Sequence, residues 1–142
     1  MEQFKLKSLF CFPLYACSKE VVRLYRPYLE RLGLTYTQYI VMVVFWERGI
    51  CNVKELGEQL FLDSGTLTPV LKNLETKGFV RRFRSDEDER VLFVELTEKG
   101  AQLKDEGIRI HGEMVKHLPI SKEESKQLYD LLNKVLDGLK DK

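Results

Sequence analysis

The spacing of the apolar residues changes twice along this chain, and that change limits the folds the chain can adopt. Before Gly78 most apolar residues recur every three or four positions, which is typical of amphipathic helices. They alternate at 79–84 and again at 90–96, which indicates two strands of a hairpin around the charged loop 85–89. Helical spacing returns after Thr97. The chain is therefore predicted to be mainly α with a small β hairpin.

The helical segments have recognisable ends and interruptions. Thr35 or Thr37 can cap the second helix, and Pro27 should kink the first helix or divide it. Gly107 and Gly112 should interrupt the helix after the hairpin and allow close helix packing. The predicted helices are 6–32, 36–48, 53–60, 64–77, 98–117 and 122–139.

Length and composition point to one compact domain over 1–142. The 142 residues, 44% hydrophobic and 32% charged, can bury a core, and they exclude disordered, collagen-like and disulfide-rich classes. The apolar run 39–46 is too short to span a membrane, and the first residues lack the apolar core of a signal peptide. We therefore expect a cytoplasmic protein with no membrane partner.

The residues that could support catalysis or metal binding are sparse. The three cysteines lack the spacing of a zinc site, so we expect free thiols. His111 and His117 lie six residues apart, and no acid–base pair has usable spacing. There is no phosphate-binding glycine motif. We predict no metal, no cofactor and no enzymatic activity.

A short helix, a polar turn, the helix 64–77 and the charged hairpin follow one another in the order of a winged helix-turn-helix. The whole chain has a net charge of only +1, but the cations from 64 to 84 face a single anion, Glu75. The pattern alone fits a small α/β scaffold equally well, and winged helices also bind proteins and RNA. The cations are Lys72, Lys77, Arg81, Arg82 and Arg84.

Four collinear segments then carry a resemblance. They are LDSGTLTP at 62–69, LKNLE at 71–75, DEDER at 86–90 and LTEKG at 96–100. With them the chain resembles the MarR family of transcription regulators and, within it, the organic hydroperoxide regulators called OhrR. The likeness runs from about Leu9 to the last helix.

The resemblance implies a homodimer that binds double-stranded DNA at a pseudo-palindromic operator and represses transcription. Regions 6–32 and 98–140 would form the dimer, and 36–97 would form the winged helix-turn-helix. Helix 64–77 would enter a major groove, while the wing, shaped by Asp88, would reach a minor groove or its phosphates. The implied DNA-binding residues are Ser64, Thr66, Thr68, Pro69, Lys72, Asn73, Arg84 and Arg90.

Cys11 lies among apolar residues, where a lone cysteine is usually core filler. Two features favour a reactive thiolate instead: the nearby helix N-terminus, and Tyr15 one turn on, whose hydroxyl can donate to an anion. Tyr25 lies near the same helical face but about 21 Å further along the axis, so the two cannot touch within one chain. If two such helices crossed antiparallel around Ser18, Tyr25 of one would lie beside Cys11 of the other.

The OhrR-like resemblance implies that Cys11 is the sensing residue and that Tyr25 and Tyr36 contact it across the dimer. Its thiolate would attack an organic peroxide to give a sulfenic acid, which would form a mixed disulfide with a low-molecular-weight thiol or oxidise further. Oxidation would then release the operator. Cys17 is beyond disulfide reach of Cys11 along a helix, and neither it nor Cys51 is expected to be required.

Two alternatives remain open at this point. In the first, the protein is a MarR-like repressor whose Cys11 is structural and whose inducer is a small lipophilic or phenolic ligand. That ligand would bind between the dimer helices and the DNA-binding domain. In the second, the protein is a thiol peroxidase, and catalytic turnover of peroxide would distinguish it from a sensor.

Overall fold

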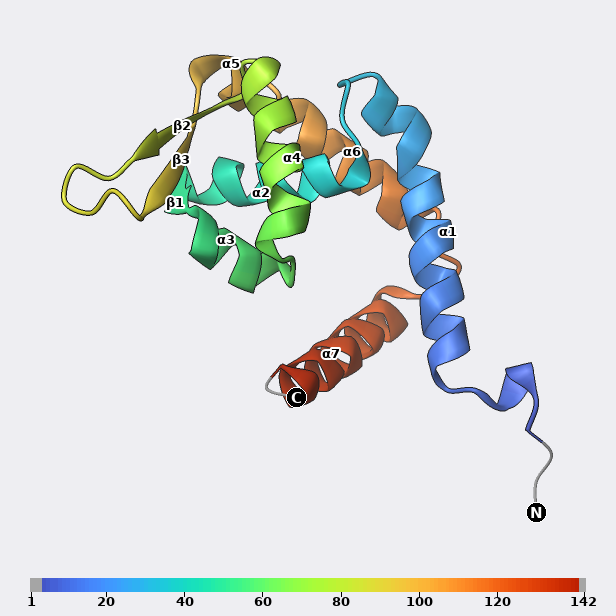
Figure 1. The fold of residues 1–142 in the computed structure, drawn as a ribbon. Helices are drawn as coiled ribbons and strands as arrows, with labels where there is room; N and C mark the ends of the chain where they lie inside the picture. Colours follow the sequence, from blue (N-terminus) through green and yellow to red (C-terminus); the bar gives the residue numbers. More distant parts are fainter. Residues whose placement is uncertain (1–3, 141–142) are drawn as a thin grey trace.

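The computed structural model describes residues 4–140 as a set of helices around a small sheet (Figure 1). The sheet lies at one side of the molecule and the long first helix at the opposite side (Figure 1). In chain order the elements are a 3-10 turn (Leu6–Ser8), α1 (Cys11–Glu30), α2 (Tyr36–Arg48), β1 (Ile50–Asn52), α3 (Val53–Leu60), α4 (Ser64–Thr76), β2 (Val80–Arg84), β3 (Leu92–Leu96), α5 (Glu98–Ala101), α6 (Lys104–Lys116) and α7 (Lys122–Leu139).

The turn between α1 and α2 is fixed by local hydrogen bonds. Gly33 has a φ of 70°, a left-handed conformation that suits the end of a helix and that other residues adopt at a cost. Thr35, rather than Thr37, caps α2, because its hydroxyl accepts from the backbone N–H of Gln38. The Gln38 side chain accepts from the N–H of Thr35 in return.

The sheet has three antiparallel strands in the order β1-β3-β2, one more than the predicted hairpin. β2 and β3 form that hairpin, with Val80 opposite Leu96. β1 pairs with the other edge of β3, with Cys51 opposite Val94. Sequence analysis missed β1 because the three residues Ile50–Asn52 are too few to show an alternating pattern.

The larger of two hydrophobic cores joins α2, α3, α4 and the sheet. One face of α4 contributes to it through Leu67, Leu71 and Leu74, each with a relative exposure of 1% or less. The spacing of these leucines turns the opposite face of α4 outward. The other fully or nearly fully buried members include Val41, Met42, Phe45, Leu56, Val80 and Val94.

A second, smaller core joins α1 to α2 and α6. It contains Tyr25 and Leu29 from α1, Tyr39 from α2, and Ile110 and Met114 from α6. The partly buried Trp46 packs against both cores. This arrangement attaches the C-terminal half of α1 to the body of the protein.

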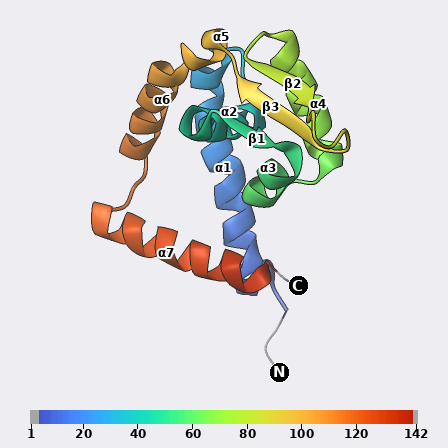
Figure 2. The same cartoon turned by 90° about the vertical axis from the view of Figure 1, so that its left-hand side faces the viewer.

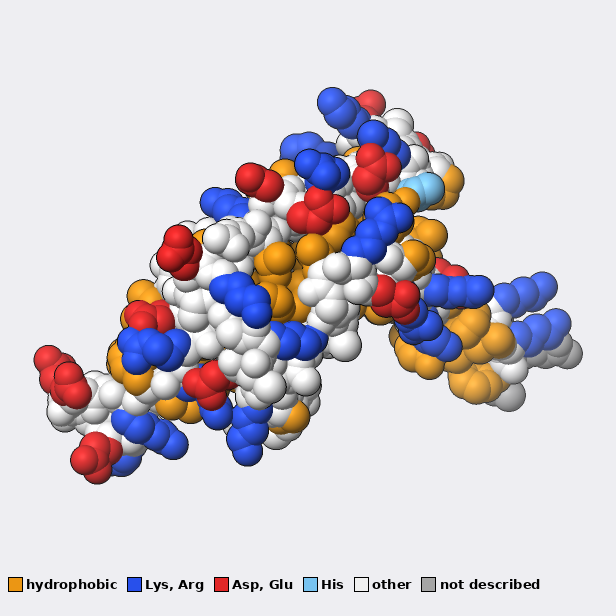
Figure 3. All heavy atoms as spheres, turned by 90° about the horizontal axis from the view of Figure 1, so that it is seen from above, with side chains coloured by type: hydrophobic (Ala, Val, Ile, Leu, Met, Phe, Trp, Pro, Cys, Tyr) orange, Lys and Arg blue, Asp and Glu red, His pale blue; other side chains and the backbone are white. Residues whose placement is uncertain are grey.

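The N-terminal half of α1 and the whole of α7 bury little apolar surface in the protomer. α7 stands apart from the sheet and its covering helices in both ribbon views, and none of its residues is buried (Figure 2). Apolar side chains also gather at the N-terminal end of the molecule (Figure 3). The face of α7 that was predicted to lie inward is therefore exposed here, at Leu128, Leu131, Val135, Leu136 and Leu139.

The two expectations about helix breaks have different outcomes. α1 continues through Pro27 without being divided, and a kink there stays a prediction. The helix after the hairpin breaks between α5 and α6, at 102–103, and not at Gly107 or Gly112. Gly107 allows close packing as expected, because a Cβ there would lie 2.4 Å from the Trp46 ring, but a Cβ at Gly112 would meet nothing within 4 Å. None of the helices described within 4–140 is both long and apolar enough to cross a membrane.

Candidate DNA-binding surface and thiol site

α4 presents a polar face to solvent along its whole length. Asp63 caps the helix by accepting a 2.8 Å hydrogen bond from the N–H of Thr66, and this bond lowers the pKa of the Asp63 carboxyl. A helix that is buried on one face and free on the other can enter a major groove. The α4 residues predicted to contact DNA are all exposed: Ser64, Thr66, Thr68, Pro69, Lys72 and Asn73.

Two of these side chains already have partners within the protomer. The Thr68 hydroxyl donates to the Ser64 carbonyl at 2.7 Å, which leaves its methyl group and lone pairs for a ligand. The Asn73 side-chain oxygen accepts from the Gln38 amide at 2.9 Å, which leaves its N–H₂ group as a donor.

The local positive charge expected from the sequence is partly cancelled in the fold. Arg82 forms an ion pair with Glu75 at 3.0 Å, and its backbone N–H donates to the same carboxylate, which lowers the pKa of Glu75. Arg81 pairs with Glu95, its cross-strand neighbour. Glu95 lies outside the stretch 64–84 used to count charges. The sequence analysis therefore counted Arg81 as a free cation.

Of the three remaining cations, one is hydrogen-bonded within the protomer and two have no ion-pair partner among residues 4–140. Lys77 donates to the backbone carbonyl of Gly33 at the end of α1. Lys72 and Arg84 are exposed and have no ion-pair partner among residues 4–140. They are the two cations of this stretch that remain available to phosphates.

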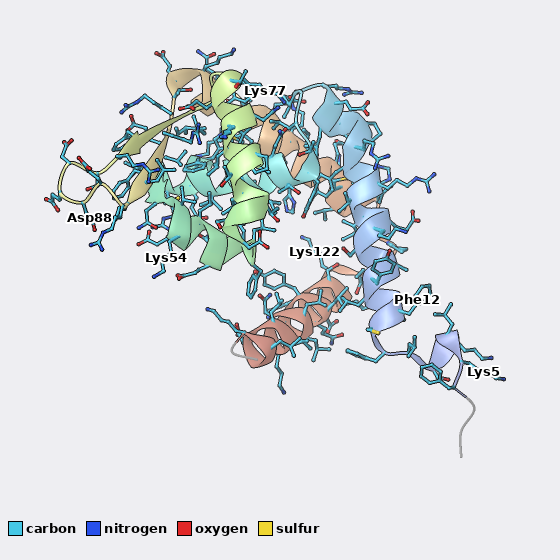
Figure 4. The ribbon with its side chains drawn as sticks, viewed as in Figure 1. Lys5, Phe12, Lys54, Lys77, Asp88 and Lys122 are labelled. Carbon is cyan, nitrogen blue, oxygen red and sulfur yellow. The ribbon has the colours of Figure 1, made fainter. Side chains whose placement is uncertain are left out.

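The wing is the loop 85–91 together with the ends of β2 and β3. Asp88 accepts from the backbone N–H of Arg90 at 3.0 Å and from its Nε at 3.1 Å, and these bonds lower the pKa of Asp88. The hydroxyl of Ser85 accepts from the N–H groups of Glu87 and Asp88. Asp88 therefore shapes the wing tip (Figure 4), while the Arg90 side chain remains 91% exposed. Acidic side chains surround this tip (Figure 3).

Cys11 is the first residue of α1, and its thiol is free and exposed. Its position in the first turn puts it where the unpaired backbone N–H groups of a helix favour an anion. Tyr15, one turn on, is 60% exposed, and Lys19 lies over its ring at 5.1 Å. Tyr15 and Cys11 therefore share an open surface at the N-terminal end of α1.

Tyr25 and Tyr36, predicted to contact the thiolate, lie together in the second core. Their ring centroids are 5.2 Å apart, and Tyr39 lies 5.5 Å from Tyr25. Burial, followed by the two neighbouring tyrosines, raises the pKa of Tyr25 to about 12. Burial likewise raises the pKa of Tyr36 and of Tyr39. All three phenols therefore stay protonated, and able to donate, at neutral pH.

The three tyrosines differ in what their hydroxyls contact. Tyr39 donates to the carbonyl of Gly107 at 2.9 Å, so its proton is used within the protomer. The hydroxyls of Tyr25 and Tyr36 form no hydrogen bond with the described residues, although no buried side-chain oxygen or nitrogen among those residues lacks a partner. Both hydroxyls are therefore at least partly accessible to solvent, and neither has an acceptor within residues 4–140.

The fold keeps Cys11 away from this pair. Cys11 and Tyr25 belong to the same continuous helix, so about 21 Å of helix axis separates them. Cys17 is also free and exposed on α1, whereas Cys51 is buried on β1, where burial raises the pKa of its thiol. Cys51 is thus shielded from oxidants in a way that Cys11 and Cys17 are not.

One groove has the apolar character that a lipophilic ligand would need. It runs between α2 and α6, with a volume of about 500 Å³, and Tyr39 and Trp46 form part of its wall. Val43 and Ile108 are exposed there, at 40% and 59%. The groove lies beside the tyrosine cluster, between the two regions where the ligand-binding alternative expects its site. Sequence analysis did not name its lining residues because they come from helices far apart in the chain.

Comparison with known proteins gives a consistent result. A model of the family described as transcriptional regulator SarA/Rot matches residues 23–107, from α1 into α6. An organic hydroperoxide resistance transcriptional regulator of Bacillus subtilis is 44% identical over 141 residues, which cover 99% of this chain and 96% of that protein.

Solved structures extend the likeness to the whole fold. A structure of reduced AbfR, a protein of Staphylococcus epidermidis, bound to DNA superimposes with a TM-score of 0.79 at 34% identity, covering 94% of each chain. A mutant of MarR from E. coli, complexed with operator DNA, gives a TM-score of 0.79 at 28% identity, covering 95% of this chain and 99% of that one.

Proposed function

This chain belongs to the SarA/Rot family of transcriptional regulators, which are MarR-like winged-helix proteins, and from that premise we propose that it is a peroxide-sensing repressor. It binds operator DNA as a homodimer when Cys11 is reduced and releases the DNA when an organic hydroperoxide oxidises Cys11. Its site of action is the cytoplasm, where bacterial relatives of this kind meet their DNA.

The proposal of a homodimer rests on the apolar surface that the protomer leaves open. The N-terminal half of α1 exposes Phe10, Phe12 and Leu14, and α7 exposes a full apolar face. Exposed apolar patches of this extent mark contacts between proteins. A second copy with the same two helices would cover both surfaces, as the symmetry of a dimer requires.

The single observation that carries the sensing proposal is that Cys11 and the phenols of Tyr25 and Tyr36 all lack a side-chain hydrogen-bond partner within residues 4–140. The hydroxyls of Tyr25 on α1 and Tyr36 on α2 have no acceptor within residues 4–140, and the thiol of Cys11 at the start of α1 has no donor there. If α1 crosses α1 of a second copy antiparallel, Tyr25 and Tyr36 of the partner subunit come beside Cys11. Two phenol donors then stabilise a thiolate at that position.

The chemistry is a two-electron oxidation of sulfur. The Cys11 thiolate attacks the outer oxygen of the hydroperoxide, the O–O bond breaks, and the sulfur gains the oxygen as a sulfenic acid. The organic fragment leaves as the alcohol and takes up the proton. A low-molecular-weight thiol then condenses with the sulfenic acid to a mixed disulfide, and water leaves. The apolar neighbours Phe10, Phe12 and Leu14 favour organic peroxides over hydrogen peroxide.

On the DNA side, α4 enters a major groove and the wing reaches the adjacent minor groove or its phosphates. Ser64 and Lys72 supply donors on α4, with Thr66, Thr68, Pro69 and Asn73 beside them. Arg84 and Arg90 supply the charge of the wing. The two copies of α4 in a dimer require two half-sites related by a two-fold axis, which is a pseudo-palindromic operator.

The comparisons support both halves of this proposal. The B. subtilis relative is named for resistance to organic hydroperoxide. AbfR is bound to DNA both in its reduced form and in an overoxidized form, so these structures support DNA binding and leave release to the titration described below. The similarity to the first covers 99% of this chain, so it extends over α1 as well as the winged helix.

The decisive experiment is an operator titration with and without oxidant. A duplex selected from a random-sequence pool by the reduced wild-type protein serves as the operator. We expect cumene hydroperoxide to release the wild type and the Cys17→Ser variant, and a thiol to restore binding. Cys11→Ser should bind the duplex but not respond to the peroxide. Peroxide-driven release of Cys11→Ser would contradict the proposal.

The same titration separates the alternatives. A ligand-induced repressor with a structural Cys11 would respond to a lipophilic or phenolic compound added without oxidant, and the groove between α2 and α6 is where such a compound would fit. A thiol peroxidase would consume many equivalents of peroxide per chain in the presence of a thiol. A sensor consumes about one equivalent per thiol before the switch is complete.

A further inference from the structure

The end of α1, the start of α2 and the C-terminal half of α4 meet in a polar junction, which we define as Gly33, Thr35, Gln38, Asn73 and Lys77. Gln38 is its centre. Its side chain is 6% exposed and is the only polar side chain classed as buried within residues 4–140. A buried amide is costly unless it is hydrogen-bonded, so its contacts are informative.

The Gln38 side chain joins the N-terminal cap of its own helix, α2, to α4. Its Oε1 accepts from the backbone N–H of Thr35 at 3.0 Å and from Lys77 Nζ at 3.4 Å. Its Nε2 donates to Asn73 Oδ1 at 2.9 Å. Lys77 also donates to the carbonyl of Gly33, and it lies at the end of α4 beside the turn between α1 and α2 (Figure 4).

The backbone determines which way both amides point. A backbone N–H can only donate, so the Gln38 atom that faces Thr35 must be the oxygen, and the atom that faces Asn73 must be the nitrogen. The Asn73 atom that receives this donor must then be its oxygen. The N–H₂ group of Asn73 is therefore turned away from Gln38, on a side chain that is exposed on the DNA-facing side of α4.

We infer that Gln38 is a positioning residue for DNA recognition. It holds Asn73 with the N–H₂ group outward, where it can donate to a phosphate oxygen or to a base acceptor, and it attaches α4 to the start of α2. This inference rests on the proposed function in one respect, namely that α4 is the helix that contacts DNA.

The same residue connects α4 with the proposed thiol contact. Tyr36 and Gln38 lie in the first turn of α2, and the capping box with Thr35 fixes that turn as one unit.

The sharpest test is Gln38→Glu, which changes one atom. The carboxylate still accepts from the N–H of Thr35 and from Lys77, but it cannot donate to Asn73. Asn73 must then flip its amide to meet the carboxylate and turn its oxygen outward. We expect the affinity of the reduced protein for the selected duplex to fall by about 5-fold or more, the loss typical of one good polar contact to DNA.

A double-mutant cycle with Asn73→Ala separates positioning from a general effect of the new charge or of the fold. Asn73→Ala alone should lower affinity by a similar factor. Adding Gln38→Glu to Asn73→Ala should then change affinity by less than about 2-fold, because the side chain to be positioned is gone. Additive losses, or an affinity of Gln38→Glu within about 2-fold of the wild type, would overturn the inference.

Two further measurements serve as controls. The midpoint of thermal unfolding shows whether each variant is folded. If Gln38→Glu does not fold, Gln38→Met replaces it in the same cycle without adding a charge. The rate of Cys11 oxidation should stay at the wild-type value, because Gln38 does not contact the thiol. If peroxide fails to release the wild type, the proposed sensing function fails, whereas the cycle in the reduced state still decides the role of Gln38.

Discussion

Single side chains of the same type have different roles in this protein because their neighbours differ. The Tyr39 hydroxyl donates to the Gly107 carbonyl, whereas the Tyr25 hydroxyl has no acceptor within residues 4–140. Arg82 is paired with Glu75, whereas Arg84 is exposed and has no ion-pair partner among the same residues. Which side chains are already bonded within the protomer therefore decides which of them are available for sensing and DNA binding.

Tyr25 should make the protein sensitive to alkaline pH. Its pKa is raised from 10.0 to about 12, so between these pH values the unfolded chain has lost the proton while the folded chain keeps it. Stability is therefore complete below pH 10 and falls as pH rises, by up to about 1.4 kcal/mol per pH unit from this group. Urea unfolding across that range should show a shallower fall for Tyr25→Phe, and parallel curves would contradict this.

Arg90 should contribute to DNA binding through its charge. Its side chain is almost fully exposed at the wing, and its bonds to Asp88 orient it without burying it. We expect Arg90→Ala to weaken operator binding and to reduce the salt dependence of the affinity by about one counterion. Arg109→Ala, which removes an exposed arginine from α6, is the control and should bind like the wild type.

At the scale of elements, the fold depends on a few close approaches between helices. α6 reaches α2 closely only because Gly107 has no side chain where the Trp46 ring lies. The Tyr39 hydroxyl bonds to the carbonyl of that same glycine, and Trp46 donates to the Gly100 carbonyl at 2.9 Å. One helix, α2, is thereby attached to both α5 and α6.

Two glycines of α6 should therefore respond in opposite ways to alanine. In Gly107→Ala the new methyl group would overlap the Trp46 ring, and overpacking of this kind costs about 1–3 kcal/mol. In Gly112→Ala the methyl group meets nothing within 4 Å in the protomer, and helix propensity should raise stability by up to about 1 kcal/mol. Chemical denaturation measures both. A destabilising Gly112→Ala would instead indicate that Gly112 lies in a contact between subunits.

At the scale of the whole molecule, the protomer leaves the apolar surfaces of two helices uncovered. α7 has an amphipathic sequence but no buried residue, and no residue in the first half of α1 is buried either. A helix whose apolar face meets only water is not favoured, because helical stability comes mainly from packing that face. The apolar surface of both helices is consistent with their burial in a dimer.

A charge on the apolar face of α7 should therefore dissociate the protein. Leu131→Glu puts a carboxylate on that face, and Lys126→Gln makes the same change in charge on the opposite face. We expect the first variant to sediment as a monomer and to lose operator binding, because one copy of α4 engages only one half-site. The second should remain a dimer. A Leu131→Glu variant that stays dimeric and binds DNA would contradict this use of α7.

Much of the candidate site could be predicted from local patterns. The cap of α2 by Thr35 and the hairpin depend on residues close in sequence, and the structure has both. The strand β1, the Arg81–Glu95 pair and the part of Gln38 in the polar junction were not predicted. Each depends on partners more than ten residues away, which the periodicity of a single segment does not report.

The sequence by itself determined the order of the main helices and of the β2–β3 hairpin, because helix caps, glycine stops and the period of apolar residues act within a few positions. It also indicated which residue types, a thiol at a helix start and phenols further along, could form a sensor. Only the tertiary structure decided which hydroxyls and cations are free and which are already bound, because hydrogen bonds and ion pairs depend on distances between side chains that folding alone brings together.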